Sequence, residues 1–268
     1  MLKRNDTYER EAKSLDHKPL RHDSAHKHVS GEAFYADDVA LPEGALHAYL
    51  GLSKIARGRV KHADFTEVLA APGVVGVLTA EDIPGHNDIS PTGRHDEPVF
   101  PVNGAIAFHG QPIFAVVART RLAARKAAAL AKIEYETQVP ILSVEKGTHE
   151  PDPLVTEPLT LQRGEPESCW GDAHHVVEGA IEIGGQDQFY LESHIAFAVP
   201  AEDGDMVITS STQHPSEVQH MVAHVLGLPT HAVTAKVRRM GGGFGGKETQ
   251  SNLFACIAAL AAHKYGAP

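Results

Sequence analysis

Short apolar runs alternate with amphipathic stretches along the chain, which predicts an intermixed set of strands and helices. In the first half we expect strands at 46–53, 74–78, 112–118 and 132–136, and helices at 63–69 and 121–131. In the second half we expect strands at 176–183, 195–199, 207–212 and 233–237, and helices at 215–226 and 249–265. Residues 31–38 give a turn-and-strand signal, and 84–99 are loop-like. The mixture indicates an α+β protein.

A polar, proline-rich stretch divides the chain into two blocks. Residues 140–166 contain five prolines, the first and last residues included, which is typical of a linker or a long surface excursion. We therefore predict a polar arm at 1–22, a first α/β block at 23–139, a linker at 140–166 and a second block at 167–268.

Composition and charge exclude several classes of protein. The 268 residues are 42% apolar and 22% charged, as in ordinary globular proteins. The formal charge of −10 argues against a nucleic-acid surface, because phosphate contacts need a basic face. No apolar run approaches the ~18 residues of a membrane helix, and the start lacks a signal-peptide core. We expect neither membrane nor nucleic-acid binding.

Metal-binding patterns are weak despite eighteen histidines. His17, His22, His26 and His28 lie in a polar N-terminal stretch, and no Cys/His set has zinc spacing. The two cysteines, Cys169 and Cys256, are far apart, and Cys256 lies in an apolar helix where a core role is favoured. We expect no metal held by protein side chains and a reducing, cytoplasmic environment.

The strongest candidate for function is the glycine-rich segment from Arg238 to Glu248, RRMGGGFGGKE. It places five glycines around Phe244. Each glycine costs a helix or strand interior about 0.5–1 kcal/mol relative to alanine, so such a run is not a regular element. It is expected where backbone must closely approach another group, usually an anion or a flat cofactor.

Two familiar glycine motifs fit this segment only in part. Gly241, Gly243 and Gly246 have the spacing of a dinucleotide fingerprint, and residues 241–247 match all but the last letter of a P-loop. However, Glu248 stands where a P-loop needs a hydroxyl, and Pro268 leaves no room for a second strand and its acidic residue. Neither motif is favoured.

Several segments together carry a resemblance to a known family. They are 30–38 (SGEAFYADD), 184–192 (GGQDQFYLE), 211–213 (STQ) and 241–248 (GGGFGGKE), in this order and spacing. From about residue 22 onward, the chain resembles the molybdenum-binding subunit of xanthine dehydrogenases, within the molybdenum hydroxylases. The first block resembles that family's hammerhead domain. The resemblance implies that the second block is the first part of a mixed α+β molybdopterin-binding domain.

The resemblance also implies a cofactor and the residues around it. Molybdenum would be held by molybdopterin rather than by protein ligands. Gly243, Phe244 and Gly245 would surround the oxo side of the metal, where close backbone amides are useful. Gln213 would donate a hydrogen bond to a cofactor oxygen without adding charge, and we count it as both catalytic and cofactor-binding. On its own, Gln213 would be an ordinary polar residue at the end of a strand.

Glu248 carries the prediction about substrate. By resemblance, a glutamate at this position accompanies purine oxidation, so we predict xanthine or hypoxanthine rather than an aldehyde, with Glu248 as a catalytic and substrate-binding residue. Its alternative role is a glutamate favoured by the dipole at a helix N-terminus. We expect Lys247 to support the loop or to lie near solvent. Arg238 and Arg239 would face the pterin phosphate or solvent. We expect the segment 184–192 to be architectural, although Gln186 within it could approach the pterin.

The implied reaction produces urate, takes its oxygen from water and passes electrons to iron–sulfur and FAD centres. Two cysteines cannot supply the usual four thiolates of even one cluster, so we expect those centres on a partner subunit in a hetero-oligomer. The family's subunit is several hundred residues longer, and the general-base glutamate would lie in that further sequence. The chain alone is therefore expected to be inactive. The alternative is a non-catalytic, truncated remnant that binds only a partner, which exposure of Val207 and Ile208 would favour.

Overall fold

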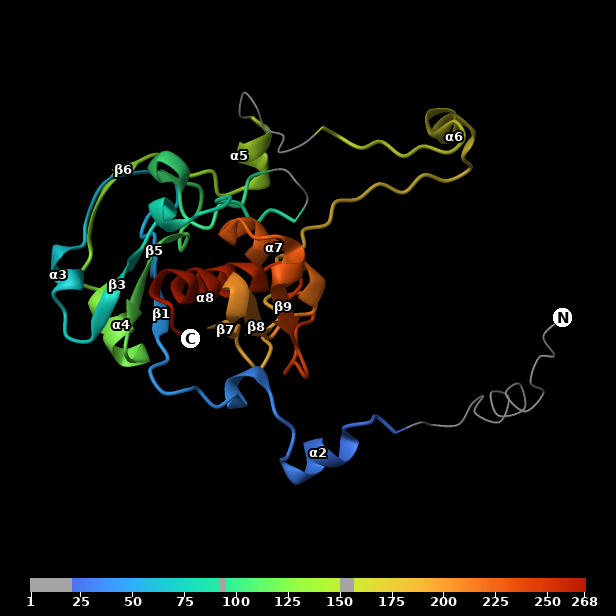
Figure 1. The fold of residues 1–268 in the computed structure, drawn as a ribbon. Coiled ribbons are helices and arrows are strands. Elements are labelled where there is room, and N and C mark those ends of the chain that lie inside the picture. Colours follow the sequence, from blue (N-terminus) through green and yellow to red (C-terminus); the bar gives the residue numbers. More distant parts are fainter. Residues whose placement is uncertain (1–20, 92–94, 150–156) are drawn as a thin grey trace, which may run out of the picture.

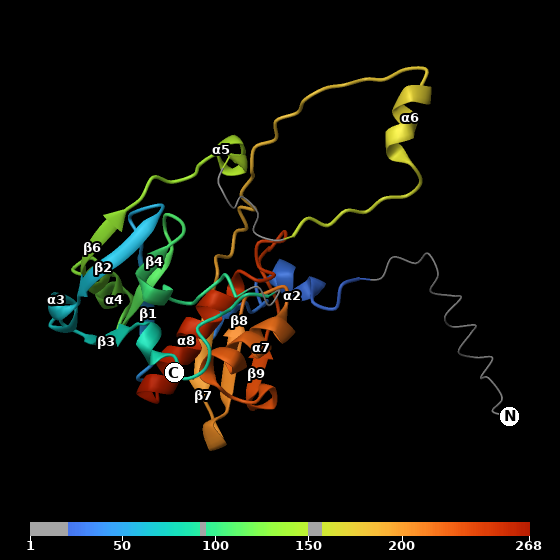
Figure 2. The same cartoon turned by 90° about the horizontal axis from the view of Figure 1, so that it is seen from above.

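The computed structural model describes residues 21–91, 95–149 and 157–268. Figures 1 and 2 show two packed blocks and one long excursion that carries helix α6 away from them.

The first block contains two three-stranded antiparallel sheets. Its strands are β1 (His47–Leu52), β2 (Gly58–Asp64), β3 (Val74–Leu78), β4 (Ala105–Ile106), β5 (Pro112–Ala118) and β6 (Lys132–Thr137). The sheet orders are β1-β5-β3 and β4-β2-β6. Strand β5 is buried along its whole length, which explains its unbroken apolar sequence PIFAVVA.

Two helices cover the strands of this block, α3 (Thr66–Leu69) and α4 (Arg121–Ala128). Helix α4 begins after Thr120, whose hydroxyl accepts a hydrogen bond from the Ala123 amide 3.1 Å away, as N-cap threonines do. Its buried alanines, Ala124 and Ala127, allow close packing against β1 and β5. A cluster around Phe114 and Val116 fills this side of the block.

The second block has one mixed sheet covered by two helices. Strands β7 (Ala196–Pro200), β8 (Met206–Ser210) and β9 (Val233–Lys236) lie in that order, antiparallel and then parallel. Helix α7 (Pro215–Leu226) connects the parallel pair β8 and β9. Helix α8 (Ser251–Tyr265) packs against β7, β8 and α7, and also against β1 of the first block (Figure 1).

The two blocks share one hydrophobic core. It joins Leu78, Phe100 and Val117 of the first block to Val218 and Leu260 of the second, and all five are fully or almost fully buried. This core fixes α8, and with it the glycine-rich segment that precedes α8.

Short helical elements complete the described structure. The α-helices are α2 (Ala25–Ser30), α5 (Val144–Thr148) and α6 (Pro166–Asp172), and the 3-10 turns are Ala36–Asp38, Ala80–Asp82, Val102–Gly104, Glu202–Gly204 and Thr230–Ala232. Residues 157–189, which we call the exposed arm, are solvent-exposed throughout. No helix among the described residues is long and apolar enough to cross a membrane.

The structure corrects several expected elements. Residues 176–183 form no strand, because alternation of side chains creates a strand only when a neighbour accepts its hydrogen bonds, and this segment pairs with none of the described residues. The helix expected at 63–69 contains only Thr66–Leu69, since Ala63 and Asp64 end β2. Residues 31–38 give a 3-10 turn instead of a strand, and α2 was not expected at all.

Candidate functional site

The glycine loop, residues 241–247, connects β9 to the turn before α8 in an irregular conformation. Gly242, Phe244 and Gly245 have φ values of 100°, 51° and 88°, in the left-handed region. Glycine adopts this region at little cost, whereas Phe244 is a non-glycine residue there. The Phe244 side chain is 76% exposed, so the loop presents it to solvent rather than to the core.

Three glycines of the loop allow it to pack closely on its own chain. A Cβ atom on Gly241 would lie 2.5 Å from Cβ of Glu192, and one on Gly243 would lie 2.5 Å from Oε1 of Gln213. A Cβ atom on Gly246 would lie 2.7 Å from Cε1 of Tyr190. Gly245 differs, because a Cβ atom there would meet nothing within 4 Å. The open side of the loop is therefore at Gly245.

The structure brings Gln213 directly against this loop. The Gln213 side-chain oxygen Oε1 accepts hydrogen bonds from the backbone amides of Gly245 (3.0 Å) and Lys247 (3.2 Å). The Gln213 backbone amide donates to the Lys247 carbonyl oxygen at 2.8 Å. Two N–H donors on Oε1 define the orientation of the side-chain amide and leave its nitrogen to donate elsewhere.

Glu248 lies in the turn that follows the loop, outside α8 and before the N-cap residue Gln250. The helix begins two residues later than the predicted start at Thr249, and both roles of Glu248, in substrate binding and at the helix N-terminus, stay predictions. Its side chain is exposed, and its carboxylate forms no hydrogen bond or ion pair with any residue that the structure describes.

A buried polar cluster of Lys247, Glu192 and Ser211 lies beneath the loop. The Lys247 side chain is fully buried, and its Nζ donates to the Glu192 carbonyl oxygen (2.6 Å) and the Ser211 hydroxyl (2.7 Å). Nζ also lies 3.3 Å from Oε2 of Glu192 and 4.7 Å from the centroid of the Tyr190 ring. Lys247 thus supports the loop and is not near solvent.

The Glu192 carboxylate joins this cluster to the start of the loop. Its Oε2 accepts hydrogen bonds from the Gly241 amide and the Ser211 hydroxyl, both at 2.6 Å. Burial acts to raise the pKa of Glu192, but these two donors and the Lys247 charge outweigh it and hold the pKa below its ordinary value. Glu192 is therefore an ionised carboxylate at neutral pH.

An aromatic pair lies next to the buried cluster. The Tyr190 hydroxyl and Nε2 of His194 are 2.7 Å apart, and the His194 ring stacks on Phe254 of α8 with centroids 4.8 Å apart. Burial, together with the nearby Lys247 charge, lowers the pKa of His194. Sequence analysis expected the segment 184–192 to be architectural but did not single out Tyr190 and Glu192 within it as supports of the loop. It also missed Ser211, which lies in the segment 211–213.

The remaining candidates lie elsewhere. Arg239 donates to the Ser24 hydroxyl (2.8 Å) and the Phe34 carbonyl oxygen (3.4 Å), so it holds the segment that precedes β1. Arg238 is exposed and lies 3.8 Å from a carboxylate oxygen of Asp23. Gln186 is exposed and lies on the exposed arm, whereas Gln188, two residues later, reaches the loop, since a Cβ atom on Gly246 would lie 3.0 Å from Cδ of Gln188.

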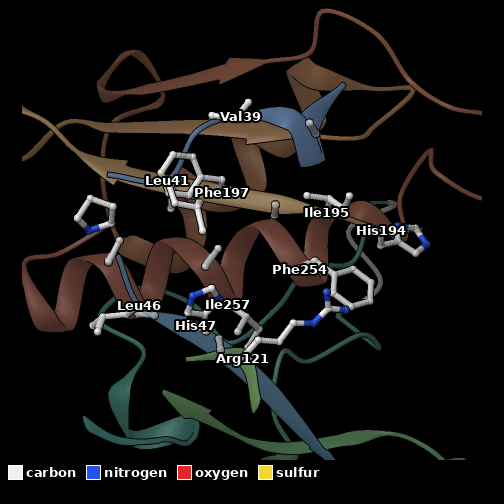
Figure 3. Close-up of a pocket in the computed structure, with 18 of the residues that line it drawn as sticks. Val39, Leu41, Leu46, His47, Arg121, His194, Ile195, Phe197, Phe254 and Ile257 are labelled. Carbon is white, nitrogen blue, oxygen red and sulfur yellow. The ribbon is translucent and has the colours of Figure 1, made fainter. Parts of the chain in front are cut away.

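A separate hollow of about 480 Å³ lies between α8, β1 and β7. Most of the residues that line it are apolar, and Arg121, His47 and His194 contribute polar atoms (Figure 3). None of Gln213, Phe244 and Glu248 lines it. We place the candidate site at the glycine loop, because polar donors and the open backbone converge there.

Two family models match the chain. The molybdopterin cofactor-binding domain matches residues 148–268, and the a/b hammerhead domain of aldehyde oxidase and xanthine dehydrogenase matches residues 30–139. The chain belongs to the molybdenum hydroxylase family. Molybdopterin and molybdenum are the cofactors of this family, and the first match contains Gln213, the glycine loop and Glu248.

Relatives of two enzyme types are similar to the chain. Xanthine dehydrogenase of Dictyostelium discoideum is 40% identical over 93% of this chain, and xanthine dehydrogenase/oxidase of Gallus gallus is 38% identical over 94%. Aldehyde oxidase 3 of Rattus norvegicus is 35% identical over 94%. The chain spans 18% of the length of each of these three relatives.

Solved structures confirm the predicted α+β fold. Aldehyde oxidoreductase from Desulfovibrio gigas matches with a TM-score of 0.78 and 26% identity, over 89% of this chain and 28% of that one. Quinoline 2-oxidoreductase from Pseudomonas putida 86 matches with a TM-score of 0.76 and 26% identity, over 91% of this chain and 33% of that one. The domain boundaries and the roles of the site residues stay predictions.

The residues at the loop would fit a molybdenum centre that is held by the sulfur atoms of molybdopterin and needs no side-chain ligand from the protein. The loop offers an exposed backbone at Gly245, where no side chain blocks approach. Gln213 provides a neutral donor, because both amides that bind its oxygen leave its nitrogen available. Neutral, preorganised donors beside an oxygen-bearing centre are the arrangement that stabilises developing charge.

Proposed function

We propose that this chain contributes one wall of the cofactor and substrate site of an enzyme that oxidises xanthine or hypoxanthine to urate. The observation that carries the proposal is the pairing of Gln213 with the glycine loop. Hydrogen bonds from Gly245 and Lys247 to its Oε1 fix the side-chain amide at the loop's open side. When bound, the molybdenum–pterin group supplies two-electron oxidation with water as the oxygen source.

Gln213 and the residues of the loop bind and orient the cofactor and take no direct part in the reaction. The Gln213 nitrogen donates a hydrogen bond to a cofactor oxygen without adding charge to the site. Gly245 keeps the backbone free of side chains on the open side, and Gly243 allows Gln213 to pack closely against the loop. The exposed Phe244 ring lies beside Gly245 at the same side of the loop.

Glu248 orients the purine. Its carboxylate is exposed and carries no hydrogen bond from the described part of the chain, so it is available to a substrate. A carboxyl group can bind a ring nitrogen or exocyclic oxygen and stabilise charge that moves onto the purine during attack. Because the relatives include both xanthine dehydrogenases and aldehyde oxidases, the proposal of a purine substrate depends on this residue.

The complete reaction needs an assembly that contains this chain. We propose that electrons pass to iron–sulfur and FAD centres on a partner subunit in a cytoplasmic hetero-oligomer, since the chain has only two cysteines. Ile208 is buried and Val207 is half-buried, so the exposure that would favour a non-catalytic remnant does not occur at these two positions.

Substitution of Glu248 in the assembled, cofactor-loaded enzyme tests the proposal. We expect Glu248→Ala to lower kcat/KM for xanthine by about 10²-fold or more, as loss of a charge-stabilising or proton-handling group does. Turnover of an aldehyde by the same preparation controls for cofactor content. Gln250→Ala, on the same exposed turn, serves as a neighbouring control. Xanthine turnover within a few fold of wild type in Glu248→Ala would show that the purine assignment is wrong.

A further inference from the structure

The backbone of Lys247 forms hydrogen bonds with Gln213 at the candidate site, and its buried side chain forms hydrogen bonds with Glu192 and Ser211. We propose that Lys247, held by Glu192 and Ser211, is a positioning residue that sets the orientation of the Gln213 side-chain amide. The importance of that orientation for catalysis rests on the proposed function. The orientation itself is a property of this chain and can be measured without cofactor or substrate.

The Lys247 ammonium has three acceptors, two on Glu192 and one on Ser211. A buried ammonium is costly unless it is paired and hydrogen-bonded. Here Nζ donates to the Glu192 carbonyl oxygen and the Ser211 hydroxyl, and Oε2 of Glu192 lies within 3.3 Å. The face of the Tyr190 ring, 4.7 Å away, adds a cation–π contact. The ammonium therefore has one defined position.

The backbone of the same residue is bonded to Gln213 in both directions. The Lys247 amide donates to Oε1 of Gln213 (3.2 Å), and its carbonyl oxygen accepts from the Gln213 amide (2.8 Å). The Thr212 hydroxyl also donates to that carbonyl oxygen at 3.2 Å. Because the side chain is fixed on Ser211 and Glu192, the backbone at 247 is fixed beside the end of β8.

The Glu192 carboxylate ties the first residue of the loop to the last. Its Oε2 accepts from the Gly241 amide at 2.6 Å and pairs with the ammonium of Lys247. Both ends of the glycine loop are thus attached to one buried carboxylate. This fixes the span of the loop, and with it the position of the Gly245 amide that holds the second hydrogen bond to Oε1 of Gln213.

A second lysine of the chain provides a matched control. Lys264 on α8 also pairs with a carboxylate, Asp82, at 2.5 Å and lies 5.6 Å from the centroid of an aromatic ring, Tyr265. It contacts the first block and not the loop. Loss of its charge removes a lysine–carboxylate pair that is more exposed than the Lys247 pair, while it leaves the surroundings of Gln213 unchanged.

The test measures hydrogen exchange and NMR shifts in the full 268-residue chain without cofactor. In Lys247→Met we expect the amides at 245 and 247 to exchange about tenfold faster or more, relative to the buried Ala255 amide of α8, because local opening no longer breaks the ion pair. The Gln213 side-chain NH₂ resonances should shift or broaden. Lys264→Met should leave all of these signals at their wild-type values.

Two further variants separate positioning from general stability. Glu192→Gln removes the charge pair with little change of shape, and it replaces Lys247→Met in the test if that variant does not fold. The double change Lys247→Met with Glu192→Leu removes both charges, which can restore stability when a buried pair is replaced by apolar groups. We expect the double variant to unfold at a higher temperature than Lys247→Met but to retain fast exchange at 245 and 247.

The outcomes decide the proposal directly. Exchange at 245 and 247 within twofold of wild type in a folded Lys247→Met or Glu192→Gln variant would overturn it. Slow exchange and an unchanged Gln213 signal in the double variant would also overturn it, because the pair would then contribute stability alone. Neither result depends on xanthine turnover, so failure here is distinct from failure of the proposed function.

Discussion

The glycine loop and the exposed arm differ in how the rest of the chain holds them, although most residues of both lie outside regular secondary structure. In the loop, Gly241, Gly245 and Lys247 donate hydrogen bonds to Glu192 and Gln213, which come from two other segments. In the arm, every residue from 157 to 189 is exposed. A segment outside helices and strands can therefore have a fixed conformation, provided that residues distant in the sequence form hydrogen bonds with it.

Susceptibility to proteases should show this difference most strongly. We expect trypsin to cleave after Arg163 on the arm far faster than after Arg125 on α4, because cleavage within a packed helix requires local unfolding. Both side chains are exposed, so the comparison reports backbone order rather than side-chain access. Mass spectrometry of brief digests would measure the two rates. Equal rates would contradict the assignment of order.

A substitution in the core should lower the free energy of unfolding more than one at an exposed position next to the arm, an effect smaller than the difference in protease cleavage. Leu260→Ala, at a fully buried position of α8, should lower the free energy of unfolding by about 2–5 kcal/mol. Leu191→Ala, at a fully exposed position just after the arm, should change it by no more than about 0.5 kcal/mol. Urea unfolding monitored by circular dichroism provides the measurement, and a large effect at Leu191 would indicate an unrecognised contact.

The buried carboxylate beneath the loop should make stability depend on pH. The pKa of Glu192 is lower in the folded state than its ordinary value of 4.5, so its stabilising contribution is present above that value. The contribution is lost as pH falls through the lower, folded-state pKa. The free energy of unfolding should be measured for wild type and Glu192→Gln between pH 7 and about pH 3. The difference between the two proteins at each pH gives the contribution of the ionised Glu192. A difference that does not decline on acidification would refute the ion-pair description.

A surface ion pair should have the smallest effect. Nζ of Lys132 lies 2.5 Å from Oε1 of Glu67, but the two side chains are 61% and 55% exposed. Lys132→Ala should therefore cost no more than about 1 kcal/mol, and high salt should reduce the loss further. Thermal unfolding in low and high salt checks this, and a loss as large as that of Leu260→Ala would contradict it.

Local signals account for the elements that were predicted well. Strand β5 follows from an unbroken apolar run, and α7 has Pro215 at its start and the left-handed Gly227 at its end. The segment 176–183 has equally clear alternation but no partner among the described residues, so the same reasoning failed there. A strand depends on its neighbour, and the pattern of one segment contains no information about that neighbour.

The site was predictable only in part for a related reason. The order of the motifs indicated Gln213 and the glycine loop, and the structure places them in contact although they lie 32 residues apart. The role of Lys247 could not be predicted, because its burial depends on Glu192, 55 residues earlier in the chain. A lysine between a glycine and a glutamate would ordinarily be placed at the surface.

A crystal structure of the cofactor-loaded assembly that contains this chain would test the central claim most directly. We predict that the Gln213 side-chain nitrogen lies about 2.7–3.2 Å from an oxygen of the cofactor, the distance of a hydrogen bond. Gly245 and Phe244 should line the same pocket. A cofactor bound elsewhere, for example in the hollow between α8, β1 and β7, would contradict the account.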